Sequence, residues 1–255
     1  MSPPLFWVDE VPAAGAEAVL SGSEGRHAVT VTRIGVGESV ILGDGAGASA
    51  LCEVLAVKGK DTLRARALEY RFTDRPRPLV TVVQALPKSE RSELVVELAT
   101  EAGADVIVPW QASRSVARWV GSKAEKGVAK WRATAAVAAK QSRRAWIPEV
   151  PDLASTTAVR ARCAAVIDEG GVVVALHESG TEGFGSIGFR DVPHVLLVVG
   201  PEGGLSEEEL TDLAALGAHT TVLGPQVLRT STAAAVALGA LGALTDRWDP
   251  ERSRH

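Results

Sequence analysis

The sequence predicts an α/β protein: a mostly parallel sheet with helices on both faces, preceded by a smaller strand-rich domain. Two patterns predict it. Up to about residue 70, short apolar segments are separated by turn signals, whereas beyond residue 78 continuous apolar runs alternate with helical patterns. A polar segment with two prolines, residues 71–78, separates the patterns. We therefore place a domain boundary there, giving domains 1–73 and 74–255.

The first domain is predicted to consist of short strands. Segment 39–42 is followed by Gly43-Asp-Gly45, whose residues tolerate the positive φ angles of tight turns. Segments 50–57 and 61–70 are two further strands. In the second of these, the residues that alternate with charged side chains are Leu63, Ala65, Ala67 and Tyr70. This alternation predicts a sheet with one buried face.

The second domain alternates between strands and helices. Its predicted strands are 79–86, 105–108, 172–176, 195–199 and 220–223, and its predicted helices are 89–103, 122–142, 206–216 and 231–248. Continuous apolar strands are typical of a sheet covered on both faces. Ser89 is a candidate N-cap, and Ser206 with Glu209 three residues later forms a capping-box pattern.

Charge is distributed unevenly along the chain. With 27 Lys and Arg against 31 Asp and Glu, the net charge is −4, which by itself argues against a nucleic-acid-binding protein. Residues 112–147, however, carry nine basic residues and one acid, and residues 200–220 carry five acids and no Lys or Arg. A local basic face attracts a polyanion even when the total is negative. The alternative is a helix with a solvated basic side.

Several classes of protein are excluded. The longest apolar stretch, 233–244, is about half the length that a membrane-spanning helix needs. The two cysteines and five histidines show no metal-ligand spacing, and no signal peptide is visible, so we expect a reduced, cytoplasmic setting without a metal. The G-x-G-x-x-G pattern at 183–188 precedes a strand and leaves no room for the helix of a dinucleotide site. We interpret it as a flexible loop.

Two glycine-proline loops follow predicted strands. Segment 199–206 passes through three glycines into the capped helix, and segment 223–233 passes through a Gly-Pro turn into the last helix. Loops at the carboxyl ends of neighbouring parallel strands form a ligand crevice, for which 176–178 is a third wall. Glu202 would repel a phosphate and favours a neutral or cationic ligand. The alternative is a plain strand-to-helix turn.

At these loops the sequence resembles the SPOUT methyltransferases, and more narrowly the ribosomal RNA small subunit methyltransferase E family of uridine-N3 methyltransferases. The loops that carry the resemblance are Gly200-Pro-Glu-Gly-Gly204 and Leu223-Gly-Pro-Gln-Val-Leu-Arg-Thr230. Further matching positions are His27, Arg33, Asp44-Gly45, Lys88, Glu101-Ala-Gly103, Pro109, Arg114-Ser115, Trp131, Gln141-Ser142, Arg144 and Pro148. Three positions depart from the family pattern: Ser231 replaces a common Glu, Arg143 a usual Gly, and Ala102 a usual Leu.

The resemblance implies a PUA-like β-barrel RNA-binding domain at the N-terminus and a SPOUT domain with a trefoil knot. It further implies a homodimer with cofactor sites near the subunit interface, and S-adenosylmethionine (SAM) as cofactor. The implied activity is methylation of N3 of a specific uridine in small-subunit (16S) ribosomal RNA, with free RNA or the assembled small subunit as partner. The alternatives are a SPOUT enzyme acting on tRNA or a ribose 2′-hydroxyl, and a non-catalytic RNA-binding module of ribosome assembly.

Roles follow for individual residues. Arg229 and Arg114 are expected to stabilise the uracil anion, and Glu202 is the candidate base for the N3 proton. The expected cofactor-binding residues are Leu176, His177, Glu178, Val199, Gly200, Pro201, Gly203, Gly204, Leu223, Gly224, Val227, Leu228, Thr230 and Ala233. The expected RNA-binding residues are His27, Arg33, Lys88, Arg91, Lys140, Gln141, Arg143 and Arg144.

Overall fold

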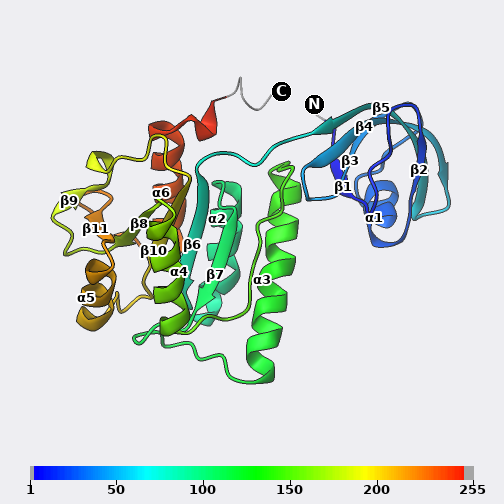
Figure 1. The fold of residues 1–255 in the computed structure, drawn as a ribbon. Coiled ribbons are helices and arrows are strands. Elements are labelled where there is room, and N and C mark those ends of the chain that lie inside the picture. Colours follow the sequence, from blue (N-terminus) through cyan, green and yellow to red (C-terminus); the bar gives the residue numbers. More distant parts are fainter. Residues whose placement is uncertain (1–2, 250–255) are drawn as a thin grey trace. The chain divides into compact units, whose positions relative to one another are not determined.

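A computed structural model of the chain describes residues 3–249, and the chain forms two compact units (Figure 1). The N-terminal unit runs to Arg75 and also includes Ala139–Ile147. The C-terminal unit consists of Pro76–Ala138 and the chain from Pro148 onward. The central segment 139–147 therefore belongs structurally with the N-terminal strands, and the functional boundary between residues 73 and 74 stays a prediction.

The N-terminal unit is built on a five-stranded sheet with the strand order β1-β3-β4-β5-β2. The strands are β1 (Leu5–Trp7), β2 (Glu17–Leu20), β3 (Ser39–Gly43), β4 (Ala48–Lys58) and β5 (Thr62–Phe72). A short helix, α1 (Gly22–Arg26), continues into one π-helical turn, His27–Val31. β1 pairs with β3 in parallel, and the other pairs are antiparallel. The three strands that the sequence predicts are confirmed.

Side-chain alternation in β5 matches the prediction over its first half only. Leu63, Ala65 and Ala67 are buried as expected. The inward placement of Tyr70 is wrong, because this side chain is 46% exposed. The end of β5 extends past the core, and Glu69–Phe72 are all exposed. The register shift between Leu51 and Cys52 marks where the regular pattern ends.

The segment after α3 (Ser122–Gln141) packs on the predicted glycine turn. Ile147 N donates to Gly45 O at 2.9 Å, and Gly47 N donates to Ala145 O at 3.0 Å. Gly47 has a φ of 104°, and a Cβ there would lie 2.7 Å from the Trp146 ring. The turn therefore needs glycine at this position for two reasons, its backbone conformation and the close approach of an indole ring.

Arg143 adopts a left-handed backbone conformation, with φ of 56°. It follows α3 as the C′ residue of a Schellman motif, in which Arg144 N donates to Ala139 O at 2.9 Å and Arg143 N donates to Lys140 O at 3.2 Å. Glycine is favoured at C′ because it has no Cβ. This geometry explains why a glycine is usual where this chain has arginine.

Replacing Arg143 by glycine should raise the free energy of unfolding by about 0.5–1 kcal/mol. This is the balance between about 1–2 kcal/mol of relieved left-handed strain and roughly 0.4–1 kcal/mol of added unfolded-state entropy. Urea denaturation followed by circular dichroism measures the change. Gln141→Gly, in the last turn of α3, is the matched control and should instead lower the free energy of unfolding. Equal destabilisation of both variants would contradict the prediction.

The C-terminal unit contains a six-stranded, fully parallel sheet with the order β7-β6-β10-β8-β11-β9. Its strands are β6 (Leu79–Ala85), β7 (Val106–Trp110), β8 (Val172–Leu176), β9 (Glu182–Gly183), β10 (His194–Val199) and β11 (His219–Val222). Its helices are α2 (Ser92–Glu101), most of α3, α4 (Thr156–Asp168), α5 (Glu207–Ala215) and α6 (Thr230–Leu244). The predicted α/β class with a parallel sheet is confirmed.

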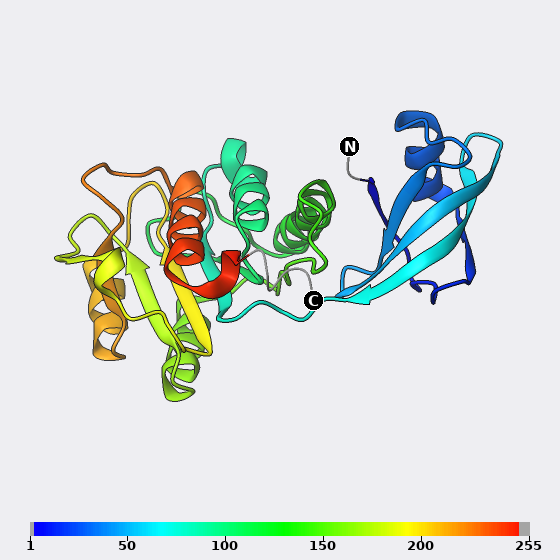
Figure 2. The same cartoon turned by 90° about the horizontal axis from the view of Figure 1, so that it is seen from above.

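Helices cover both faces of this sheet (Figure 2). In β10, Leu196 and Val198 belong to the core beneath α4 and α5, together with Val159 and Leu213 of those helices. Successive strand residues point to opposite faces, so Leu197 faces the side on which α6 packs against β10. Both sets are buried, which is why the strands are continuously apolar in sequence.

Two helix predictions need correction, and one helix was missed. The predicted helix 231–248 is two elements, because Thr245 is extended (φ −129°, ψ 175°) and ends α6 before a 3₁₀ turn, Asp246–Trp248. The predicted helix 89–103 starts as a 3₁₀ turn, Ser89–Arg91, and α2 begins at Ser92 without a side-chain cap. Helix α4 was not predicted.

The described residues bear on membrane spans, metal clusters and the G-x-G-x-x-G segment. Among residues 3–249 no helix is long and apolar enough to cross a membrane, and no group of three or more His, Cys, Asp or Glu could hold a metal ion. The G-x-G-x-x-G segment forms the short strand β9 and a 3₁₀ turn, Phe184–Ser186, so the absence of a dinucleotide-binding helix is confirmed. The segment is anchored at Phe184, which is buried and packs on Phe189, and its flexibility stays a prediction.

His194 makes the stability of the C-terminal unit depend on pH. Its Nε2 lies 2.8 Å from Thr81 Oγ1, and burial lowers the pKa of the imidazole below 6.5, with the carboxylates of Glu169 and Asp105 opposing the shift. The unfolded chain therefore binds a proton more readily than the folded chain as the pH falls below about 6.5.

The free energy of unfolding of the wild type should consequently fall, relative to that of His194→Gln, as the pH is lowered from 7.5 to 5. The difference should change by at most about 1.4 kcal/mol per pH unit, the limit for one proton. Urea titrations across this pH range on both proteins measure it. A constant difference between the two proteins would show that His194 does not titrate differently on folding.

Candidate functional site

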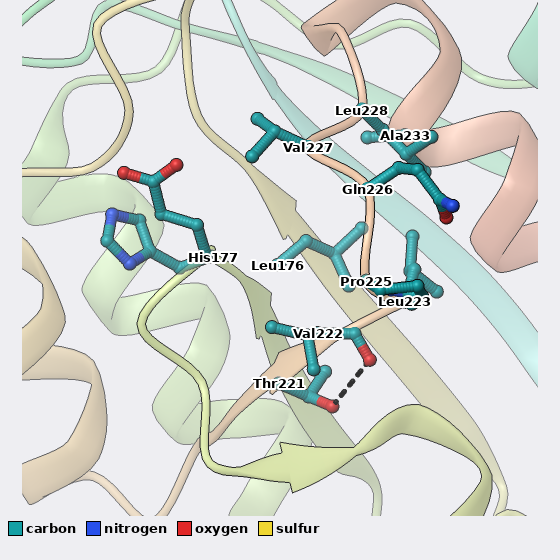
Figure 3. A pocket seen from close by; sticks show the side chains of 12 residues that line it. Leu176, His177, Thr221, Val222, Leu223, Pro225, Gln226, Val227, Leu228 and Ala233 are labelled. Atoms are coloured by element: carbon teal, nitrogen blue, oxygen red, sulfur yellow. Dashed lines mark hydrogen bonds between the residues drawn. The ribbon is translucent and has the colours of Figure 1, made fainter.

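A pocket of about 160 Å³ opens at the carboxyl ends of β8 and β11 (Figure 3). Its walls are Leu176–Glu178 after β8, Thr221–Leu228 at the end of β11 and in the following loop, and Ala233 in the first turn of α6. β10, β8 and β11 are adjacent in the sheet, so the loops that follow them meet at one edge. The crevice expected from the two loop sequences therefore exists.

The pocket contains many of the residues that the sequence singled out. The expected cofactor-binding residues that line it are Leu176, His177, Glu178, Leu223, Gly224, Val227, Leu228 and Ala233. Sequence reasoning missed the lining residues Thr221, Val222, Pro225 and Gln226. The last two lie inside the loop already quoted, so their position between predicted lining residues was a usable signal.

His177 stands between the pocket and the glycine-rich loop. Its Nδ1 accepts a hydrogen bond from Ser179 N at 3.2 Å and lies 2.7 Å from Ser179 Oγ. On its other side, a Cβ added to Gly204 would lie 3.4 Å from Nε2, and Gly204 has a φ of 69°. The imidazole thus contacts the backbone of the loop that follows β10.

The glycine-rich loop, residues 199–206, lies next to the pocket but contributes no residue to its lining. The expected cofactor-binding residues outside the pocket are Val199, Gly200, Pro201, Gly203, Gly204 and Thr230. The loop closes through Gly204 N, which donates to Pro201 O at 2.9 Å. At Gly200 a Cβ would lie 3.0 Å from Leu205 N, so a larger residue would push the loop open. That these residues bind the cofactor stays a prediction.

The capping box at the start of α5 is confirmed and has a further role. Ser206 Oγ accepts from Glu209 N at 3.1 Å, and Glu209 Oε2 accepts from Ser206 N at 2.9 Å. The other carboxylate oxygen of Glu209 accepts from Ser113 N at 2.9 Å. Glu209 is buried, and it therefore joins the helix cap to the loop that carries Arg114.

Arg114 holds the glycine-rich loop directly. Its Nη1 donates to Gly203 O at 3.2 Å and to Leu205 O at 3.0 Å. Glu202 lies in the same loop, and its Oε1 accepts from Lys88 N at 3.0 Å. Both residues therefore make contacts that shape the site, in addition to any contact with a substrate.

Arg229 differs from Arg114. It is the exposed N-cap residue of α6, and its carbonyl accepts from Ala233 N at 3.0 Å. Its guanidinium makes no hydrogen bond or ion pair within residues 3–249. A cation beside the pocket loop that no described residue neutralises is suited to bind an anionic substrate group.

Part of the basic segment is neutralised. Lys140 Nζ lies 2.6 Å from Glu24 Oε2 and 3.0 Å from His27 Nδ1, and its side chain is 14% exposed. Lys130 pairs with Glu93, and Arg132 with Asp152. Lys140 and His27 thus have contacts inside the N-terminal unit. The other expected RNA-binding residues that are exposed are Arg33, Lys88, Gln141 and Arg143.

Both parts of the chain match known families of RNA methyltransferases. Residues 74–242 match the model of an RNA methyltransferase domain, and residues 20–68 match that of an RNA methyltransferase PUA domain. A ribosomal RNA small subunit methyltransferase E of Mycobacterium bovis is 53% identical over 249 residues, which cover 98% of this chain and 95% of the relative. The chain belongs to the ribosomal RNA small subunit methyltransferase E family.

A second relative and a solved structure are also similar to this chain. The methyltransferase E of Bacillus subtilis is 35% identical, covering 89% of this chain and 90% of its own. A Legionella pneumophila protein, solved with bound SAM, has a TM-score of 0.82 and 28% identity and covers 96% of this chain and 99% of its own. The PUA-like N-terminal domain and the methyltransferase fold expected from the resemblance are confirmed.

Proposed function

We propose that this chain transfers the methyl group of SAM to N3 of a uridine in small-subunit ribosomal RNA. The observation that carries the proposal is the pocket at the ends of β8 and β11, which is lined by the 223–228 segment on which the resemblance to the methyltransferase E family rests. Related proteins are named for action on small-subunit ribosomal RNA, and the similar Legionella pneumophila protein binds SAM.

The composition of the pocket suits SAM. Apolar side chains of Leu176, Val222 and Leu228 offer a surface for the adenine ring, whose edge can bond to loop backbone groups. Glu178 at the rim supplies an acceptor and a negative charge for polar and cationic parts of the ligand. Bound SAM supplies a methyl group activated by its positively charged sulfur.

The protein has to orient the uridine and deal with its N3 proton. Methyl transfer is an in-line displacement, so orientation supplies much of the rate. The proposed role of Arg229 is to stabilise the uracil anion through its oxygens or an adjacent phosphate. Arg114 fixes the facing loop, and Glu202, whose carboxylate oxygen Oε1 accepts from Lys88 N, is the proposed base. Glu202→Gln should then lower turnover at saturating SAM, and full turnover would remove Glu202 as the base.

Ribosomal RNA would be held by basic residues of the chain, with the target base unstacked into the site. Lys88, Arg33 and Arg143 are exposed, and Arg143 and Arg144 follow the end of α3. Binding should weaken steeply with salt, and the double variant Arg143→Ala, Arg144→Ala should flatten the slope of log affinity against log salt by about 1–2. An unchanged slope would remove these two residues from the RNA surface.

Two measurements test the proposed function. Calorimetry with SAM separates a methyltransferase from a non-catalytic RNA-binding module. Mass spectrometry of ribosomal RNA from a strain lacking the protein should show the loss of one 3-methyluridine, restored by the intact gene. Loss of a methyl group from tRNA or from a ribose 2′-hydroxyl would favour another SPOUT activity. The trefoil knot and the homodimer belong to the same proposal, and sedimentation analysis tests the dimer.

A further inference from the structure

Gln84 is a buried polar residue in an otherwise apolar part of the sheet. It lies near the end of β6, is 1% exposed, and is flanked by Val83 and Ala85. Its Nε2 donates to Thr230 Oγ1 and to Ala85 O, both at 3.0 Å. Its Oε1 has no hydrogen-bond partner within residues 3–249. A buried acceptor without a partner costs stability, so packing alone does not favour glutamine here.

Thr230 extends this link to the glycine-rich loop. It is the first residue of α6 and is 7% exposed. Its hydroxyl accepts the hydrogen bond from Gln84 and donates to Gly200 O at 2.6 Å. Leu228 and Ala233, on either side of Thr230 in the chain, both line the pocket. One hydroxyl therefore joins β6, the loop after β10 and the start of α6.

The sheet register places this link level with the pocket. Gln84 is paired with Val199, Val199 with Leu176, and Leu176 with Thr221, so the four residues form one row across β6, β10, β8 and β11. Leu176 and Thr221 line the pocket. Gln84 therefore lies in the same row of the sheet as two residues that line the pocket, on the other side of β10 from them.

Two other contacts come from the same part of the chain. Lys88 N donates to Glu202 Oε1 at 3.0 Å, and Arg91 Nη1 donates to Ser231 Oγ at 3.3 Å. The segment after β6 therefore bonds to the glycine-rich loop through its backbone and to the first turn of α6 through a side chain. Of these contacts, only the Gln84–Thr230 hydrogen bond joins two buried side chains, since Lys88 and Glu202 are exposed and Arg91 is half-buried.

We propose that Gln84 is a positioning residue for the methyl donor. Through Thr230 it holds the start of α6 against the glycine-rich loop, so that both loops are ordered before SAM binds. This inference rests on the proposed function. A site whose loops are already ordered avoids the entropy cost of ordering them on binding, and removing the link should therefore reduce the affinity for SAM.

The test compares variants that differ by single groups. Gln84→Met keeps the shape and removes the donor, Thr230→Val removes the bridging hydroxyl, and Thr230→Ser retains it. Thr81→Val is the matched control, because Thr81 is another buried threonine of β6 whose hydroxyl bonds to His194, away from the loops. Calorimetry gives the dissociation constant for SAM, steady-state kinetics give KM and kcat, and thermal unfolding gives Tm.

Gln84→Met and Thr230→Val should raise the dissociation constant and KM for SAM roughly tenfold, about the value of one net hydrogen bond. Thr230→Ser should restore wild-type affinity, and Thr81→Val should change Tm without changing affinity. Wild-type affinity in Thr230→Val, or an equal loss in Thr81→Val, would overturn the inference. If Gln84→Met does not fold, the two Thr230 variants decide. A wild-type protein that does not bind SAM would instead contradict the proposed function.

Discussion

Replacing Arg229 by alanine should lower the rate of methyl transfer to ribosomal RNA by roughly 10²-fold, the usual effect of deleting one group that stabilises a developing anion. The reason is that the guanidinium has no partner within residues 3–249 and lies at the start of α6, beside the loop that lines the pocket. Affinity for SAM should change by less than about threefold, because only the backbone of this residue belongs to the helix cap. Single-turnover transfer of radiolabelled methyl groups and calorimetry measure the two quantities separately.

Two further variants sharpen this result. Arg229→Lys keeps the charge but not the planar fork, and it should recover part of the rate. Arg190→Ala removes another exposed arginine of the same unit and should leave the rate unchanged. A large loss of SAM affinity in Arg229→Ala, with normal transfer at saturating SAM, would assign Arg229 to the donor and not to the uridine.

Replacing Asp105 by asparagine should reduce the free energy of unfolding by about 3–5 kcal/mol, as expected when a buried charge loses its partner. Asp105 Oδ2 accepts from Arg247 Nη1 at 2.9 Å and from Val80 N at 2.8 Å. The Arg247 guanidinium also donates to Gly103 O and Pro78 O. The side chains are 0% and 5% exposed, so water cannot replace the lost contact. Urea denaturation at pH 7.5 measures the change.

The matched control is Asp152→Ala, which removes an ion pair with Arg132 whose side chains are 93% and 53% exposed. It should cost less than about 1 kcal/mol. Combining Asp105→Asn with Arg247→Met should cost less than the sum of the single variants, because the second change removes the charge that the first left unpaired. Additive costs would show that the two side chains do not stabilise one another.

Much of the fold could be predicted from local patterns. Strands β8 and β10 of the parallel sheet are apolar runs that follow a glycine and a proline closely, and the Ser206–Glu209 capping box is a local signal that the structure reproduces. Helix α4 has no comparably clear pattern. Tyr70 shows the other limit: an alternation can be recognised, but the point where a strand leaves the core depends on other elements.

The candidate site was predictable where its residues follow strands directly. Leu176–Glu178 and Leu223–Leu228 could be placed together because parallel strands end at one edge. The contacts that order the site could not be predicted from the sequence. Gln84 bonds to Thr230, and Lys88 to Glu202, across more than a hundred residues, and no sequence pattern pairs them. A charge count along the sequence also misses such long-range contacts. Lys140, for example, adds to the basic total of residues 112–147 but is paired with Glu24.

The assignment of Ala139–Ile147 to the N-terminal unit has a consequence for synthesis and for truncation. The chain leaves that unit at Arg75, returns to it at Ala139 and leaves it again after Ile147. A fragment ending at Arg75 lacks Trp146, whose ring occupies the space over Gly47. The N-terminal unit is therefore not an autonomous stretch of chain. During synthesis on the ribosome, the N-terminal unit can be completed only after helix α3 and the segment Ala139–Ile147 have been made. Its strands, which are synthesised first, therefore stay without this part of their unit until more than half of the chain exists.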